Sequence, residues 1–191
     1  MTGDLGAATL DVHAKAREVT GFWFALTPEQ HFARSEKLDA EIKARFGPLR
    51  DLVLGSGAAG WRDDPETVLA AIILLDQFSR NLHRDSAEAY AADPLALQLA
   101  LEAINRGWEV AMTAEERQFL YLPLEHAEDP AMQALSVEKF GSLGDAYILD
   151  FAQKHAEVIA RFGRFPSRNA VLGRESTAEE RAFLSEEGSG W

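Results

Sequence analysis

Three short polar stretches contain the side chains best suited to chemistry. They hold guanidinium groups, which donate forked hydrogen bonds to carboxylates and phosphates, and amides that fix the orientation of a bound group. They also hold carboxylates and imidazoles, the usual acid–base groups of enzymes. The candidates are Asp76, Arg80, Asn81 and Arg84 in the first stretch, Glu125, His126 and Asp129 in the second, and His155, Arg164, Arg168 and Asn169 in the third.

A Ser-Arg-Asn turn occurs in two places. Residues 78–86 contain Phe-Ser-Arg-Asn followed by Arg-Asp-Ser, and residues 165–176 contain Phe-Pro-Ser-Arg-Asn followed by Arg-Glu-Ser. Arginine suits the negative end of a helix and asparagine tolerates the left-handed conformation that ends one, so both turns fit simple helix exits. In the functional alternative, Arg80 and Arg168 approach one shared cavity and hold one ligand.

Asp76 continues an apolar helix face. It follows Leu69 by seven residues and Ile72 by four, and Arg80 lies one further turn along the same face. A charge on a core-facing stripe is costly unless it is paired. We therefore expect Asp76 to be largely buried, with Arg80 as its nearest partner in the sequence. The two residues form either a structural ion pair or the floor of a pocket that has Asn81 and Arg84 at its rim.

Charge is segregated in the second half of the chain. Residues 115–129 hold five acids and one base, whereas residues 154–174 hold five bases and one acid. The two blocks either neutralise each other across a helix interface or form opposite walls of a cleft. In both cases we expect at least one of Glu125, Glu128 and Asp129 to contact an arginine of the basic block.

The two histidines of these stretches have different surroundings. His155 lies on the apolar stripe of its helix, where a hydrogen-bonded core histidine is the more common case. His126 is flanked by carboxylates that can orient it. Pro123 interrupts the preceding helical pattern, and the resulting kink would change the direction of nearby side chains.

Several kinds of site are not supported by any motif. The chain has no His-Glu-x-x-His motif, no calcium loop and no doubled Glu-x-x-His pairing, so we expect no metal. It also has no Gly-x-Ser-x-Gly elbow, no phosphate loop and no dinucleotide fingerprint, so we expect no cofactor.

The elements that must position these residues are helical. Apolar residues recur at three- and four-residue steps through most of the chain, and no long segment alternates with period two. We expect an all-α fold of about eight to ten helices, arranged as stacked antiparallel hairpins within a single domain of residues 1–191. The pattern predicts a helix over 28–46 that stops at Gly47-Pro48, a loop over 55–60 anchored by Trp61, and a buried helix after Asp64. Further helix starts are predicted at Thr27-Pro28, Asp93-Pro94, Thr113, Asp129-Pro130 and Thr177.

Composition narrows the environment and the partners. The formal net charge of −12 disfavours nucleic acid as a partner. The longest run without polar residues, 68–75, is too short to span a membrane, and residues 1–11 do not resemble a signal peptide. The chain has no cysteine, which excludes disulfides and fits a cytoplasmic location.

Segments spread over most of the chain carry a family resemblance. They are residues 22–24, 28–46, 76–81, 119–129 and 161–169. Together they resemble the domain of unknown function 924 family, with His31 as a departure where that family has tryptophan. The resemblance implies a fold similar to tetratricopeptide-repeat proteins. It implies no reaction, because the activity of the family is uncharacterised.

Three functions remain open from the sequence. The leading hypothesis is a groove lined by Arg80, Asn81, Arg164, Arg168 and Asn169 that binds an anionic small molecule or an acidic peptide segment. The second is an enzyme that uses Glu125, His126 or His155 as acid–base groups. The third is a structural protein-interaction module without a small-molecule site. The ligand and the oligomeric state do not follow from the sequence.

Overall fold

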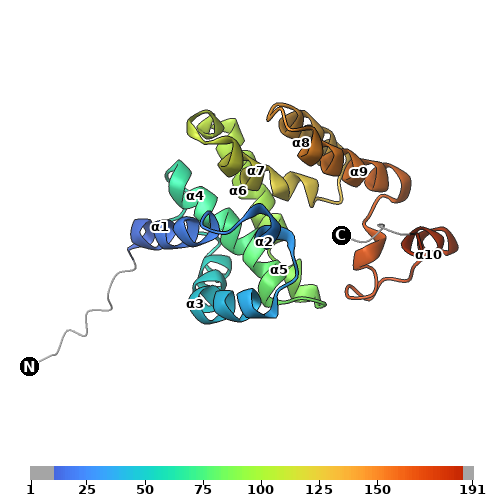
Figure 1. The fold of residues 1–191 in the computed structure, drawn as a ribbon, viewed down its shortest axis with the longest axis horizontal. Helices are drawn as coiled ribbons and strands as arrows, with labels where there is room; N and C mark the ends of the chain where they lie inside the picture. Colours follow the sequence, from blue (N-terminus) through green and yellow to red (C-terminus); the bar gives the residue numbers. More distant parts are fainter. Residues whose placement is uncertain (1–10, 187–191) are drawn as a thin grey trace, which may run out of the picture.

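The computed structural model describes residues 11–186, and all regular structure in this range is helical, which confirms the all-α prediction (Figure 1). Residues 1–10, on which the expectation of no signal peptide largely rests, lie outside the described residues. No helix of the described range is both long and apolar enough to cross a membrane. The α-helices are α1 (Val12–Trp23), α2 (Pro28–Phe32), α3 (Glu36–Gly55), α4 (Pro65–Ile72), α5 (Ser79–Leu82), α6 (Asp93–Asn105), α7 (Ala114–Glu125), α8 (Pro130–Gly141), α9 (Ala146–Phe162) and α10 (Ala178–Leu184).

The centre of the molecule is one continuous apolar helix. It runs from α4 through a π-helical segment, Ile73–Phe78, into α5, and every residue from 67 to 79 is buried. Helices α1, α3, α6 and α7 pack around it. A helix that is apolar on every side must be covered on every side, which is why this segment lies in the core. The prediction of a buried helix after Asp64 is confirmed, whereas the π-helical turn was not predicted.

Most helix starts follow their predicted caps. Thr27, Thr113 and Thr177 each form a capping box with the residue three positions later, and Asp64 and Asp129 accept backbone N–H groups of the first turn. The predicted helix start at Asp93-Pro94 is confirmed in position, but the N-cap is Ala92 and no side chain caps the helix. The carboxylate of Asp93 is therefore available for another role.

The prediction of one helix over 28–46 was right at its start but wrong in its middle and at its end. The chain leaves the helix at Ala33, which is extended, and α3 begins only after its own cap, Ser35. At the other end α3 continues through Gly47-Pro48 to Gly55. Proline removes one helical hydrogen bond, but burial of Phe46 before it and Val53 after it keeps the helix against the core.

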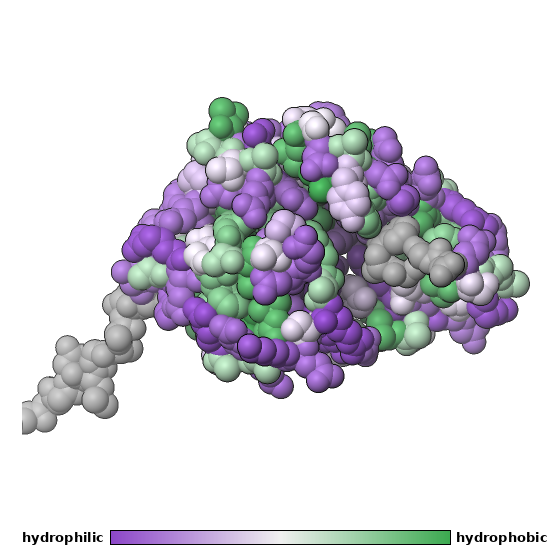
Figure 2. All heavy atoms as spheres, in the orientation of Figure 1, coloured by the Kyte–Doolittle hydropathy of each residue, from purple (hydrophilic) through white to green (hydrophobic). Residues whose placement is uncertain are grey.

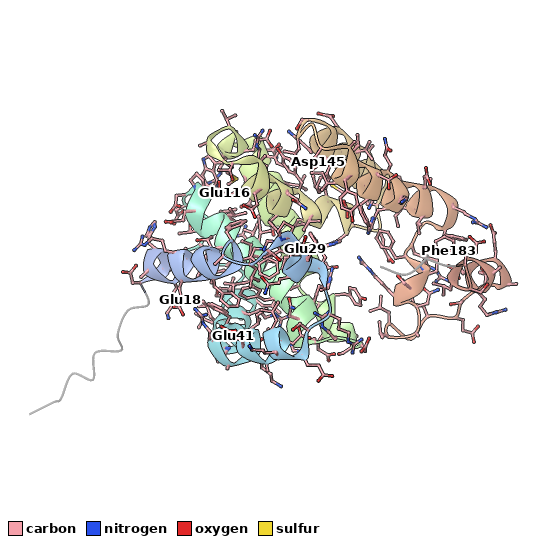
Figure 3. All side chains as sticks on the ribbon, viewed as in Figure 1. Glu18, Glu29, Glu41, Glu116, Asp145 and Phe183 are labelled. Atoms are coloured by element: carbon pink, nitrogen blue, oxygen red, sulfur yellow. The ribbon has the colours of Figure 1, made fainter. Side chains whose placement is uncertain are left out.

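The C-terminal part forms a small second core. Helices α8 and α9 pack against each other, and α9 ends at Gly163, whose φ of 71° is left-handed. Beyond it the chain turns back through a 3₁₀ turn, Pro166–Arg168, to reach α10. There Phe183, labelled in Figure 3, packs on Phe162 with ring centroids 5.2 Å apart. The part of the chain from Gly163 to the end of α10 is called the closing segment below. Figure 1 shows it facing α2 and α5 across the molecule.

Candidate functional site

A cavity of about 680 Å³ lies between the two parts of the fold. One wall comes from α2, α5 and the loop after α5, and the other from α7, α9 and the 3₁₀ turn of the closing segment. Figure 2 shows the hollow in the surface between these parts. Seven of the candidate residues line it, namely Arg80, Asn81, Arg84, Glu125, His126, His155 and Arg168. Asp76 is buried behind His126 and does not itself line the cavity.

The two arginines of the repeated turn meet in this cavity. Arg80 forms a bidentate ion pair with Asp93, with N–O distances of 2.8 and 2.9 Å, and Arg168 lies 3.5 Å from the same carboxylate. Both guanidinium carbons lie over the ring of Tyr90, 4.6 Å and 4.7 Å from its centroid. The hypothesis that Arg80 and Arg168 approach one shared cavity is confirmed.

Arg168 has the fewest polar contacts of these guanidinium groups. The only hydrogen bond that its guanidinium makes to another described residue is the long one from Nη1 to Asp93, although the side chain is only 12% exposed. Its flat face also stacks on Phe165, 4.5 Å from the ring centroid. Burial, and then the positive charge of Arg80, lower the pKa of Arg168. Most of its donors are therefore available to the cavity.

Asp76 is buried, as the register predicted, but its main partner is not Arg80. The Asp76 side chain is 1% exposed, and its Oδ1 lies 2.7 Å from Nδ1 of His126 and 3.9 Å from Nη2 of Arg80. The amide of Gln77 donates to Oδ2. Burial by itself would raise the pKa of Asp76, but His126 and Arg80 outweigh it and hold that pKa at about 2.

The ionised state of Asp76 fixes the tautomer of His126. A carboxylate only accepts hydrogen bonds, so the hydrogen of the neutral imidazole lies on Nδ1 and the lone pair on Nε2. His126 lines the cavity, and its Nε2 has no hydrogen-bond partner among residues 11–186. The result is an oriented base on the cavity wall.

Glu125 and His155 form a second titratable pair. Oε1 of Glu125 lies 3.5 Å from Nδ1 of His155, and that nitrogen also lies 2.9 Å from the carbonyl oxygen of Phe151. Burial raises the pKa of Glu125 to about 7, and burial lowers the pKa of His155 to about 3. At neutral pH His155 is therefore uncharged and donates to Phe151, while Glu125 is close to half protonated.

The rim residues Asn81 and Arg84 are already engaged. Both donate to Asp39 on α3, from Asn81 Nδ2 at 2.7 Å and from Arg84 Nη2 at 2.9 Å. Burial opposes ionisation of Asp39, but the hydrogen bonds from Arg84 and Asn81 and the charge of Arg84 together outweigh it and lower the pKa of Asp39. These two residues line the cavity with few donors to spare.

Three candidate residues lie outside the cavity. Arg164 forms a bidentate pair with Glu180, at 2.7 and 2.9 Å, and buried Asn169 donates to Ser176 and Glu180. These contacts hold the first part of the closing segment, which contains Arg164 and Asn169, against α10. Asp129 caps α8 and lines a smaller hollow of about 410 Å³. The prediction that Arg164 and Asn169 share one groove with Arg80 was wrong, because both residues pair with Glu180 of α10 and neither lines the cavity.

The opposed charge blocks do meet. Glu128 forms a bidentate pair with Arg174, at 2.7 and 2.9 Å, and also accepts the backbone N–H of Phe165 at 2.7 Å. The prediction that one acid of this block contacts an arginine of the other is confirmed. The contact fixes the turn that carries Arg168 over the cavity.

Four contributors to the site were not found from the sequence. Asp93 was interpreted only as a helix start, and Asp39 and Tyr90 carry no local signal because their partners are more than eight residues away in the chain. His31, the departure from the family pattern, also lines the cavity, and its Nε2 lies 2.9 Å from the carbonyl oxygen of Trp23.

One group of described side chains has the spacing of metal ligands. His13, Asp64 and Glu66 have ligand atoms within 4.8 Å of one another. They lie at the surface near the start of α4, where Asp64 caps the helix and Glu66 lies 3.8 Å from Arg17. They contribute nothing to the cavity wall.

Comparisons with known proteins match a part of the chain that contains the whole cavity lining. The model of a family described as bacterial proteins of unknown function, DUF924, matches residues 19–188. A solved structure of a protein of unknown function from Agrobacterium tumefaciens has 40% sequence identity and a TM-score of 0.87, and the match covers 92% of this chain and 99% of that one. The search of curated proteins gave no match. The matched range contains every residue that lines the cavity.

Proposed function

The chain belongs to the DUF924 family, whose description assigns no activity, and we propose that its central cavity binds a small anionic molecule. The observation that carries this proposal is the Arg168 guanidinium, which lines the cavity almost buried and makes one long hydrogen bond to the described residues. A guanidinium with free donors recognises carboxylates and phosphates through two parallel hydrogen bonds.

Electrostatics favour an anion at this position. Asp93 is shared between Arg80 and Arg168, and Arg80 takes both of its oxygens. Two neighbouring guanidinium groups repel each other, and both are desolvated here. An anion that binds Arg168 would supply the second negative charge and so reduce that repulsion.

The size and the apolar lining of the cavity favour a small molecule with an apolar part over a peptide segment. The volume of about 680 Å³ lies within the range typical of small-molecule sites. Phe140, Ile148 and Phe151 supply an apolar part of the cavity lining, and Tyr147, which also lines the cavity, is 72% exposed. The ligand class that fits is a small carboxylate or phosphate on an apolar body.

A purely structural module is a weaker interpretation. It requires the arginines of the site to be fully paired, and Arg84, Arg164 and Arg174 do meet that requirement. Arg168 does not. We also propose a cytoplasmic location, because a chain without cysteine fits a reducing compartment.

Thermal unfolding in the presence of benzoate and succinate tests the binding proposal. Benzamide serves as the uncharged ligand control, and chloride keeps the ionic strength constant. At ten times its Kd a ligand adds about 1.4 kcal/mol of stability, which raises the Tm of a chain of this size by about 3–6 °C. We expect this rise for benzoate with the wild type and a much smaller one with Arg168→Gln.

Arg17→Gln is the matched control, because Arg17 is an exposed arginine of α1 outside the cavity. It should retain the full response. The proposal fails if neither carboxylate raises the Tm of the wild type by more than it raises the Tm of Arg168→Gln, or if benzamide raises the Tm of the wild type as much as benzoate does.

A further inference from the structure

We propose that the cavity hydrolyses small anionic esters, with His126 Nε2 as the general base and the carboxyl group of Glu125 as the general acid. The inference rests on the proposed function, because Arg168 would hold the anionic group of the ester. It goes beyond binding by assigning a reaction to the acid–base groups of the same cavity.

The first argument is the geometry around His126. Asp76 Oδ1 lies 2.7 Å from Nδ1, which leaves the lone pair of Nε2 on the cavity wall. A buried carboxylate that holds an imidazole in one tautomer also stabilises the imidazolium that forms after proton uptake. Asp76 belongs to the π-helical segment, a local deformation that often marks functional positions. In this reading Asp76 is a positioning residue.

The second argument is that a proton donor lies next to this base in the sequence. Glu125 precedes His126, and its carboxyl group is 5% exposed and lies against His155, 3.5 Å away. Burial holds its pKa at about 7, so a protonated carboxyl group is available in the pH range in which an imidazole accepts a proton. Two titratable groups with opposite roles therefore line one cavity.

The third argument comes from the rest of the lining. Among the described residues that line the cavity there is no serine, threonine, cysteine or lysine. The nucleophiles that these four residue types supply are therefore missing from this wall, and in the proposed reaction the attacking group is water. Hydrolysis by water needs no further reactant.

In the proposed hydrolysis, protons pass between water, His126, Glu125 and the leaving alcohol. Nε2 of His126 takes a proton from water while the water oxygen forms a bond to the acyl carbon, which gives a tetrahedral oxyanion. The bond from the acyl carbon to the ester oxygen then breaks, and the carboxyl group of Glu125 gives its proton to that leaving oxygen. The products are a carboxylic acid and an alcohol. The imidazolium proton passes to the Glu125 carboxylate through solvent, which restores both groups.

Two chromogenic esters test the inference without knowledge of the natural substrate. 4-Nitrophenyl hydrogen succinate carries an anionic group, and 4-nitrophenyl acetate does not. We expect the wild type to release 4-nitrophenolate from both, with a higher kcat/KM for the succinate ester. His126→Gln should lower kcat/KM for both esters by about 100-fold or more. His13→Gln, which changes an exposed histidine of α1, should leave both rates unchanged.

The leaving group separates the role of Glu125. 4-Nitrophenolate is stable without protonation, whereas phenolate from phenyl hydrogen succinate gains more from an acid. Glu125→Gln should therefore lower kcat/KM for the phenyl ester at least tenfold more than for the nitrophenyl ester. An equal loss on the two esters would overturn the assignment of Glu125.

Different results would overturn the anion-site proposal and the hydrolysis proposal. If Arg168→Gln lowers the preference for the succinate ester while His126→Gln has the wild-type rate, the anion site stands and the hydrolysis proposal is overturned. If His126→Gln loses the rate and Arg168→Gln keeps the wild-type preference, the proton-transfer assignment stands and the anion site fails. A wild type that hydrolyses neither ester faster than His126→Gln also overturns the hydrolysis proposal.

The removal of His126 leaves Asp76 buried without its main partner, so a second measurement uses the unaltered chain. Diethyl pyrocarbonate acylates unprotonated, accessible imidazole nitrogen, and peptide mass spectrometry locates the product. We expect loss of esterase rate to follow acylation of His126, with succinate slowing both. Acylation of His126 without loss of rate would overturn the proposal.

In Asp76→Asn, ¹⁵N imidazole spectra should show a larger fraction of the Nε2–H tautomer, which a merely structural role would not require.

Discussion

At the scale of single residues, burial acts on Glu125 and His155 in opposite directions. Glu125 has a folded pKa of about 7 against an ordinary value of 4.5, so its contribution to stability is complete below pH 4.5 and is lost as the pH rises through 7. His155 has a folded pKa of about 3 against 6.5, so its contribution is complete above pH 6.5 and is lost as the pH falls towards 3. The two groups oppose each other between these limits.

Replacement of Glu125 by glutamine removes one of these opposing effects. We expect the free energy of unfolding of Glu125→Gln, relative to the wild type, to improve by about 2–3 kcal/mol between pH 5 and pH 8, because only the wild type must ionise a buried carboxyl group. Urea unfolding at several pH values measures it. Parallel stability curves for the two proteins would show that Glu125 titrates normally in the folded state.

The residue scale also shows where prediction from the sequence ends. The burial of Asp76 followed from its register with Leu69 and Ile72, because a helix repeats its face every three or four positions. Its main partner, His126, is 50 positions further along the chain, and no local pattern links the two. The sequence indicated Arg80 instead, since the i,i+4 neighbour is the only contact that helix geometry alone supplies.

At the scale of elements, Asp129 caps α8 and lies outside the main cavity. Its Oδ1 accepts the backbone N–H groups of Ala131 and Met132, at 2.8 and 3.1 Å. We expect Asp129→Ala to lower the free energy of unfolding by about 1 kcal/mol and to leave benzoate binding unchanged. Asp64→Ala, which removes the corresponding cap of α4, serves as the comparison. Weaker benzoate binding by Asp129→Ala, with the stability of the wild type, would return Asp129 to the site.

Helix starts were easier to predict than helix interruptions. A cap is a local device, and the threonine and aspartate caps act within three residues of their own position. The break after α2 and the passage of α3 through Pro48 depend on what the flanking residues pack against. The π-helical turn from Ile73 to Phe78 was also missed, since π geometry is rare and the apolar pattern of this segment contains no signal for it.

At the scale of the whole molecule, the cavity depends on segments that are distant in the chain. Arg168 reaches Asp93 across 75 positions, and Arg174 reaches Glu128 across 46. The sequence predicted that the charge blocks meet, because opposite charges of that density must be neutralised somewhere. It did not predict which arginines stay on the cavity side, since this depends on how the closing segment turns after Gly163.

The arginine side chains also reconcile an acidic molecule with an anionic ligand. A net charge of −12 repels small anions at long range, but screening in salt limits that repulsion to roughly 10 Å. Inside the cavity, water is partly excluded and each guanidinium acts more strongly. The proposed recognition would therefore depend on a few buried donors and not on the charge of the surface.

The most direct test of the central claim is an NMR titration that follows the arginine Nε–H resonances during addition of benzoate. The Arg168 resonance is assigned by its absence from the spectrum of Arg168→Gln. The account predicts that this resonance shifts with saturation, that the resonance of exposed Arg17 does not, and that benzamide has no effect. A stationary Arg168 resonance, or an equal drift of all arginine resonances, would contradict the claim that Arg168 binds an anion in this cavity.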